Sequence, residues 1–202
     1  MFFNKLFFAI LPFFLAGSQA QLVPNAARAS NLHPVSIVGD ATAVANELNH
    51  GTRIYYQPPG GGISQICTNE AFAAGGDTTC DASVVPSQYV LPGTPIVATT
   101  ALTNGGAFDE IHVFFLSPDY ILSEWRWTSA GGPRFGDGCP NCVTHSAFGA
   151  VNGSEVLYAI QSSRPATKLR VGFVSVASPT TITEATWNFN TNVWSLAVLP
   201  DM

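Results

Sequence analysis

The sequence predicts an all-β fold in which one β-hairpin module occurs three times. The clearest copy spans 111–127, where apolar and other side chains alternate along two short segments that flank the turn residues 117–120. The residues at the matching position of the three copies are Arg53, His112 and Arg170, spaced 59 and 58 residues apart. A fixed period of this size is typical of a repeat architecture.

Each copy is predicted to contain four short strands separated by clusters of Gly, Pro, Asn, Asp and Ser. The three units cover about 36–92, 93–151 and 152–202. The expected strands are 36–45, 53–57, 63–67 and 84–89 in the first unit, 95–102, 111–116, 121–127 and 143–148 in the second, and 154–161, 169–174, 182–187 and 193–198 in the third. Residues 41–48 also allow a helix, but their place in the repeat favours a strand.

Four-stranded antiparallel units at this period are typical of the blades of a β-propeller, which surround a central channel. Propellers close with about 4–8 blades, so three blades would form an open arc with exposed apolar sheet faces. Two such chains would complete a six-bladed ring. The sequence therefore predicts three blades per chain, half of a six-bladed ring, and a homodimer that closes it.

Residues 1–20 have the composition of a secretory signal peptide: an early Lys5, an apolar run over 6–15, and small residues before a cleavage position after Ala20. A membrane-spanning helix would need roughly 20 apolar residues, more than this run supplies. Residues 21–35 are interpreted as a lead-in segment, and a secreted, extracellular protein is expected. The net charge of −5, without a basic cluster, argues against nucleic acid or an anionic membrane as partner.

The four cysteines, Cys67, Cys80, Cys139 and Cys142, suit the disulfides of an exported protein, and three pairings are open. Pairing Cys67 with Cys80 and Cys139 with Cys142 is favoured because each bond then lies within one repeat. The alternative is a zinc site, which would need a second closely spaced pair, and no metal or other cofactor is expected. Asn152 begins an Asn-Gly-Ser sequon and is a candidate glycosylation site.

The repeated motif resembles that of the fungal fucose-specific lectin family, in which Arg-Val-Tyr-Tyr, a turn, and Ile-x-Glu-x-x-Trp precede an aromatic residue and a glycine. The matching segments are 53–57 with 63–65, 112–115 with 122–127, and 170–173 with 182–187. Segment 93–98 resembles the innermost strand of the family. The likeness covers about 36–199, and its specificity lies in the repetition. It implies a propeller with sugar pockets between neighbouring blades.

The resemblance also implies which side chains bind the sugar. An arginine and a glutamate would bind its hydroxyls, and a tryptophan of the same or a neighbouring blade would pack on its apolar face. The residues carried over are Arg53, Gln65 and Phe72 in the first copy, His112, Glu124, Trp127 and Phe135 in the second, and Arg170, Glu184, Trp187 and Trp194 in the third. Three positions depart from the family pattern: Gln65 replaces Glu, Thr68 replaces Trp, and His112 replaces Arg.

The function implied by the resemblance is a secreted lectin that recognises L-fucose or fucosylated glycans and has no catalytic activity. One alternative is a structural or effector protein that keeps the ring and has lost sugar binding, in keeping with the substitutions at 65, 68 and 112. Another is a secreted glycan-processing enzyme, which would need two carboxylates about 5–9.5 Å apart. The sequence indicates no such pair and contains no Gly-x-Ser-x-Gly, His-Glu-x-x-His or phosphate-loop motif.

Overall fold

A computed structural model describes residues 34–162 and 168–200 of the 202-residue chain. The predicted signal peptide, residues 1–20, and residues 21–33 of the lead-in segment lie outside the described residues. In the described part, the helical segments are short 3-10 turns, and none is long and apolar enough to cross a membrane.

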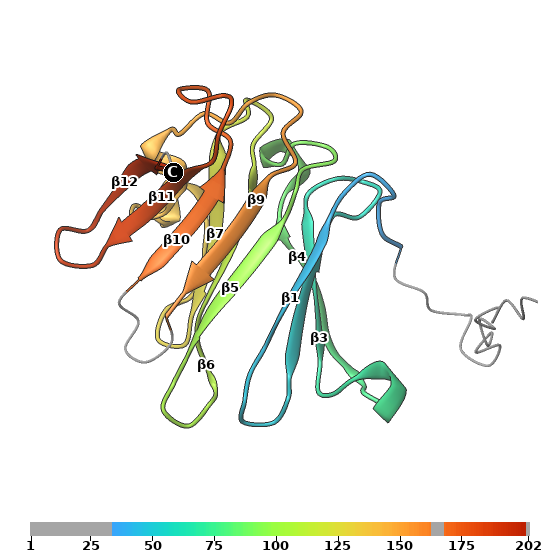
Figure 1. Cartoon of the computed structure of the whole chain (residues 1–202). Coiled ribbons are helices and arrows are strands. Elements are labelled where there is room, and N and C mark those ends of the chain that lie inside the picture. The colour runs from blue at the N-terminus through green and yellow to red at the C-terminus, as the bar shows by residue number, and fades with distance from the viewer. Residues whose placement is uncertain (1–33, 163–167, 201–202) are drawn as a thin grey trace, which may run out of the picture. The chain divides into compact units, whose positions relative to one another are not determined.

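The chain forms three four-stranded antiparallel sheets, each with its strands in chain order (Figure 1). This confirms the predicted all-β fold with three four-stranded units, which we call blades 1, 2 and 3. Blade 1 contains β1 (Ala41–Ala45), β2 (Thr52–Tyr56), β3 (Ile63–Thr68) and β4 (Thr78–Val85). Blade 2 contains β5 (Val97–Leu102), β6 (Phe108–Leu116), β7 (Leu122–Thr128) and β8 (Gly132–Arg134), and blade 3 contains β9 (Leu157–Gln161), β10 (Leu169–Phe173), β11 (Thr183–Asn188) and β12 (Val193–Val198).

The fourth strands of blades 1 and 2 differ from the prediction. In blade 1, β4 begins before the expected segment 84–89 and overlaps it only at residues 84–85, and residues 87–89 form the 3-10 turn η2 (Ser87–Tyr89). In blade 2, the expected strand 143–148 is largely the 3-10 turn η4 (Val143–Ser146), and the short β8 takes the place of the fourth strand. The reason is a tertiary contact: Val143 donates its N–H to the Glu124 side chain, and the Thr144 hydroxyl accepts the Glu124 N–H, so this segment contacts β7 without forming a ladder.

Two apolar clusters hold the blades together, one in each seam. The cluster between blades 1 and 2 includes Tyr55 and Trp125, whose ring centroids are 5.7 Å apart. The cluster between blades 2 and 3 includes Phe114 and Val171, both fully buried. The first strands of the blades, β1, β5 and β9, lie side by side (Figure 1). Period-2 alternation thus places the apolar side chains of each blade against a neighbouring sheet.

Both disulfides of the favoured pairing are present. Cys67–Cys80 joins β3 to β4, and Cys139–Cys142 closes the turn before η4. All four cysteines are therefore bonded, and the structure leaves no free thiol among them. Among residues 34–162 and 168–200, no group of His, Cys, Asp and Glu side chains is arranged to hold a metal ion.

Candidate functional site

The three hairpins hold their polar residues in one common register. In each hairpin, the second residue of the pair is the cross-strand partner of the residue that lies two positions after the first. Both side chains of the pair therefore lie on the same face of the sheet. The pairs are Arg53 with Gln65, His112 with Glu124, and Arg170 with Glu184. The repeat seen in the sequence is therefore also a geometric repeat.

The tryptophans belong to different pockets from the ones expected. Trp127 lies three residues after Glu124, and Trp187 lies three residues after Glu184. An odd separation along a strand places two side chains on opposite faces. Trp127 therefore lines the pocket toward blade 1, and Trp187 lines the pocket toward blade 2. This corrects the grouping of each tryptophan with the polar pair of its own copy.

The first pocket, which we call the Arg53 pocket, is a cavity of about 210 Å³ between blades 1 and 2. It is lined by Arg53, Gln65, Cys67 and Cys80 of blade 1 and by Phe108, Ile111 and Trp127 of blade 2. The Arg53 guanidinium lies over the Phe108 ring, with its carbon 5.3 Å from the ring centroid. The Gln65 amide nitrogen lies 3.1 Å and 3.2 Å from the two sulfurs of the Cys67–Cys80 disulfide. Polar groups of one blade thus face apolar and aromatic side chains of the next.

The second pocket, the His112 pocket, has the same position between blades 2 and 3 but holds only about 10 Å³, roughly the space of one water molecule. It is lined by Glu110, His112, Glu124, Arg126 and Asn141 of blade 2 and by Leu169, Trp187, Phe189 and Trp194 of blade 3. Little space is left in the pocket because the polar side chains of blade 2 that line it are held together by hydrogen bonds to one another.

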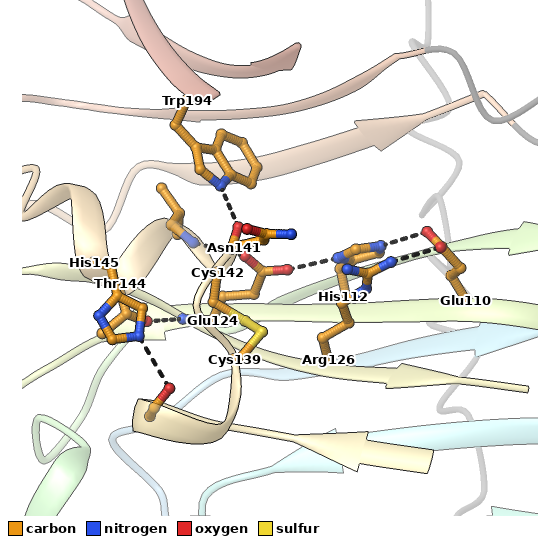
Figure 2. Close-up of a disulfide and its surroundings, with 12 residues drawn as sticks. Glu110, His112, Glu124, Arg126, Cys139, Asn141, Cys142, Thr144, His145 and Trp194 are labelled. Atoms are coloured by element: carbon orange, nitrogen blue, oxygen red, sulfur yellow. Dashed lines mark hydrogen bonds and ion pairs between the residues drawn. A yellow bond between two sulfur atoms is a disulfide. The ribbon is translucent and has the colours of Figure 1, made fainter. Parts of the chain in front are cut away.

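Figure 2 shows the bonds that close the His112 pocket. His112 Nδ1 lies 2.6 Å from Glu124 Oε1, and its Nε2 lies 3.1 Å from Glu110 Oε2. Arg126 donates to the other Glu110 oxygen at 2.7 Å, and the Val143 N–H donates to Glu124 Oε2 at 2.8 Å. His112 is 3% exposed and Glu124 is 1% exposed. An imidazole with a carboxylate at each nitrogen donates from both when it is protonated, so the arrangement suits an imidazolium.

The titration of this cluster follows from its contacts. Burial alone would lower the pKa of His112, but its hydrogen bonds to Glu110 and Glu124 outweigh burial and raise that pKa above 6.5. The hydrogen bond from His112 is the largest cause that lowers the pKa of Glu110 to about 2, and Arg126 adds to it against the effect of burial. The cluster is therefore most stable with a protonated histidine between two carboxylates.

The raised pKa of His112 predicts that the protein loses stability as the solution becomes alkaline. A group whose pKa is higher in the folded state contributes fully below its unfolded pKa of about 6.5 and loses that contribution as the pH rises through the folded value. Thermal unfolding between about pH 5 and pH 9 should therefore show a falling Tm for the wild type and a flatter profile for His112→Gln. Parallel profiles for the two proteins would contradict the protonated cluster.

The third pair, the Arg170 site, lies on the outer face of blade 3. Arg170 Nη1 lies 3.1 Å and 3.3 Å from the two oxygens of Glu184, and the Tyr158 hydroxyl donates to Glu184 at 2.9 Å. The Tyr158 ring lies against Gly172, where a Cβ atom would collide with it. The Arg170 and Glu184 side chains are 38% and 25% exposed. Among residues 34–162 and 168–200, the two seams lie between blades 1 and 2 and between blades 2 and 3, so neither of them walls this site.

The three aromatic residues expected to complete the pockets lie in different environments. Trp194 lines the His112 pocket and donates its indole N–H to the Asn141 carbonyl at 2.9 Å. Phe135 packs on Tyr89 and Phe115 in the seam of blades 1 and 2 and does not line the Arg53 pocket. Phe72 lies on the 3-10 turn η1 (Phe72–Ala74), is 70% exposed and lines neither pocket. The position of an aromatic residue in the sequence after each hairpin therefore does not predict whether its side chain lines a pocket.

Sequence reasoning missed several residues of these sites, and three of them show why. Glu110 lies two residues before His112, so period-2 spacing could have placed both on one face. Phe108 was hidden by an irregularity in the pairing of β5 with β6, where Ala101 pairs with Glu110 but Leu102 pairs with Phe108. Tyr158 comes from β9 and meets Glu184 only through the tertiary fold.

Comparison with known proteins finds similarity in structure alone. No protein-family model matches the chain, and no curated protein matches its sequence. Among solved structures, AofleA from Arthrobotrys oligospora is 20% identical with a TM-score of 0.65. The match covers 83% of this chain and 44% of the AofleA chain. The fungal lectin of Aleuria aurantia, described as a six-bladed β-propeller with a novel fucose recognition mode, is 18% identical with a TM-score of 0.60, over 83% of this chain and 51% of that one.

The fold is half of a six-bladed β-propeller. The chain spans about half the length of AofleA and of the Aleuria lectin. A fucose lectin from Kordia zhangzhouensis, solved with methyl-fucoside, is 14% identical with a TM-score of 0.52. The match covers 80% of this chain and 100% of the Kordia lectin chain. At these identities the likeness establishes the arrangement of blades, and the ligand is a separate question.

Proposed function

We propose that this protein is a secreted carbohydrate-binding lectin, without catalytic activity, that recognises L-fucose or fucosylated glycans. The observation that carries this proposal is the common register of the polar pairs on three blades of a propeller fold. The solved structures that share the fold include the Aleuria lectin in complex with alpha-methyl-L-fucoside. Secretion through residues 1–20 belongs to the same proposal, as does a glycan on Asn152, which is exposed in the segment between blades 2 and 3.

The Arg170 site has the chemistry to bind sugar hydroxyls. A guanidinium is a fork of donors, and a carboxylate is an acceptor, so the two together match neighbouring hydroxyls that both donate and accept. Glu184 is held in place by Arg170 and Tyr158 before any ligand arrives. A pre-positioned pair spares the ligand the entropic cost of ordering these side chains.

We propose further that two chains close a six-bladed ring. Blade 3 exposes apolar side chains at Ile160 and Val193, on the same face as Arg170 and Glu184, which a neighbouring blade would cover. In the two seams of the chain, the polar pair of one blade faces apolar and aromatic side chains of the next blade, among them Ile111 and Trp127 in blade 2 and Leu169 and Trp187 in blade 3. Blade 1 of a second copy would wall the Arg170 site, with Thr52 and Thr68 at the positions that match Ile111 and Trp127. A native mass equal to a single chain would rule this ring out.

The His112 pocket favours loss of sugar binding at that one seam. Its histidine and both glutamates are already bonded to one another, and the space left is about that of one water molecule. The two carboxylates that flank His112 are thus engaged with it, which also makes them poor candidates for a glycosidase pair. We therefore expect fewer ligand sites than blades.

Calorimetric titration with methyl α-L-fucoside tests the proposal. Saturable binding is expected with fewer than three sites per chain, because the His112 pocket is closed. Incubation with fucosylated oligosaccharides should release no free sugar. A flat titration of a correctly folded sample would contradict the lectin assignment, and release of free sugar would favour the enzyme.

A further inference from the structure

We infer that the Arg53 pocket binds an anionic saccharide, a sugar that carries a carboxylate or a sulfate group. This inference rests on the proposed carbohydrate-binding function and assigns a second ligand class to one of its pockets. It is carried by the charge of the pocket, by the space in it, and by the placement of the Arg53 guanidinium.

The Arg53 pocket differs from the other two sites in charge. The Arg170 guanidinium is paired with the Glu184 carboxylate, and His112 is flanked by two carboxylates. At the position that matches Glu184, the Arg53 pocket has the neutral Gln65. Among residues 34–162 and 168–200, Arg53 makes no ion pair, so its positive charge is not neutralised by a contacting carboxylate.

The Arg53 pocket also has room for a ligand beside the charged Arg53 guanidinium. Its cavity of about 210 Å³ contrasts with about 10 Å³ in the His112 pocket at the equivalent seam. Trp127 and Phe108 supply aromatic surface on the side of blade 2. A sugar ring packs its apolar face on such surfaces, which leaves its polar substituents to reach the wall formed by blade 1.

The guanidinium of Arg53 is placed to bind an anion. It stacks over Phe108, and one of its nitrogens donates to the Thr52 carbonyl at 3.2 Å. A guanidinium has five N–H donors in a planar fork, so several remain for a ligand. Carboxylate and sulfate oxygens match that fork better than neutral hydroxyls do, because the hydrogen bonds are charge-assisted on both sides.

The neutral side chain of Gln65 also favours an anionic ligand. Its amide nitrogen contacts the disulfide sulfurs, which leaves its carbonyl oxygen as an acceptor for a sugar hydroxyl. A glutamate here would hold Arg53 in an ion pair and repel an anionic ligand. The neutral amide keeps the acceptor without that repulsion.

The test compares methyl β-D-glucuronide with methyl β-D-glucoside, in which a neutral hydroxymethyl group replaces the carboxylate, by calorimetric titration of the full-length protein. The glucuronide is expected to bind at least about tenfold more tightly at low salt, and the preference should shrink as salt screens the charge. The 6-sulfate of the same glucoside, in a third titration, distinguishes a carboxylate site from a sulfate site.

Two variants and one control sharpen the test. Gln65→Glu should abolish the preference for the anionic glycoside, and Arg53→Gln should do the same. Arg134→Ala, at an exposed arginine of β8, should retain it. Equal binding of the neutral and anionic glycosides by the wild type, or a preference that survives both pocket variants, would overturn the inference. Methyl α-L-fucoside binding in the same samples separates this failure from that of the lectin proposal.

Discussion

Replacing Glu124 with alanine is expected to lower the free energy of unfolding by about 3–5 kcal/mol. The side chain is 1% exposed, and its two oxygens bond the His112 ring and the Val143 N–H. Truncation would leave a buried imidazolium beside one carboxylate only and a buried N–H without its acceptor. Removal of one partner from a buried charged pair is among the most destabilising of point mutations.

Urea denaturation of the purified variant measures this loss. Glu155→Ala is a suitable control, because Glu155 is exposed and its loss should change stability by no more than about 0.5 kcal/mol. Glu124→Gln keeps the shape of the side chain without its charge and should lie between the two. If Glu124→Ala unfolds at the same urea concentration as Glu155→Ala, Glu124 does not hold this seam together.

Arg170→Ala and Glu184→Gln should each weaken the binding of methyl α-L-fucoside by about 10–100-fold, which corresponds to the loss of hydrogen bonds to a charged group. Both side chains are partly exposed, and an ion pair of this kind contributes about 0–1 kcal/mol to stability. Binding should therefore fall while thermal unfolding changes little. This separation distinguishes the Arg170 site from the buried His112 cluster, where stability is expected to fall.

Calorimetry on both variants, with Glu155→Gln as the matched control, gives the comparison. The control changes one exposed carboxylate outside the site, so its affinity should equal that of the wild type. Wild-type affinity in both Arg170→Ala and Glu184→Gln would show that fucoside binds elsewhere.

Much of the fold could be predicted because it repeats. The hairpin motif occurs three times with matched spacing, so the errors of any single strand assignment matter less than the shared pattern. The missed fourth strands show where this fails: residues 143–148 are apolar enough for a strand, yet they bond the Glu124 side chain and backbone through Val143 and Thr144. Such bonds depend on which segments meet in space.

The candidate sites were predicted less completely than the fold. The polar pairs were readable because each lies within one hairpin, whose register keeps both residues on one face. Trp127 and Trp187 were grouped with the wrong pairs, although their odd separation from Glu124 and Glu184 already placed them on the opposite faces. Phe135 and Phe72 had no signal that could separate a pocket wall from a seam or an exposed turn.

The amino-acid sequence alone determined the number of blades, the hairpin at the centre of each, and the polar pair that each hairpin holds, because these depend on alternation and contacts between residues close in the chain. Only the tertiary structure decided which pocket is open. The His112 pocket is closed by Glu110, Arg126 and Trp194, whereas the Arg53 pocket keeps its space and an arginine without an ion pair among the described residues. That difference arises where two blades meet, from distances that no spacing within one repeat can specify.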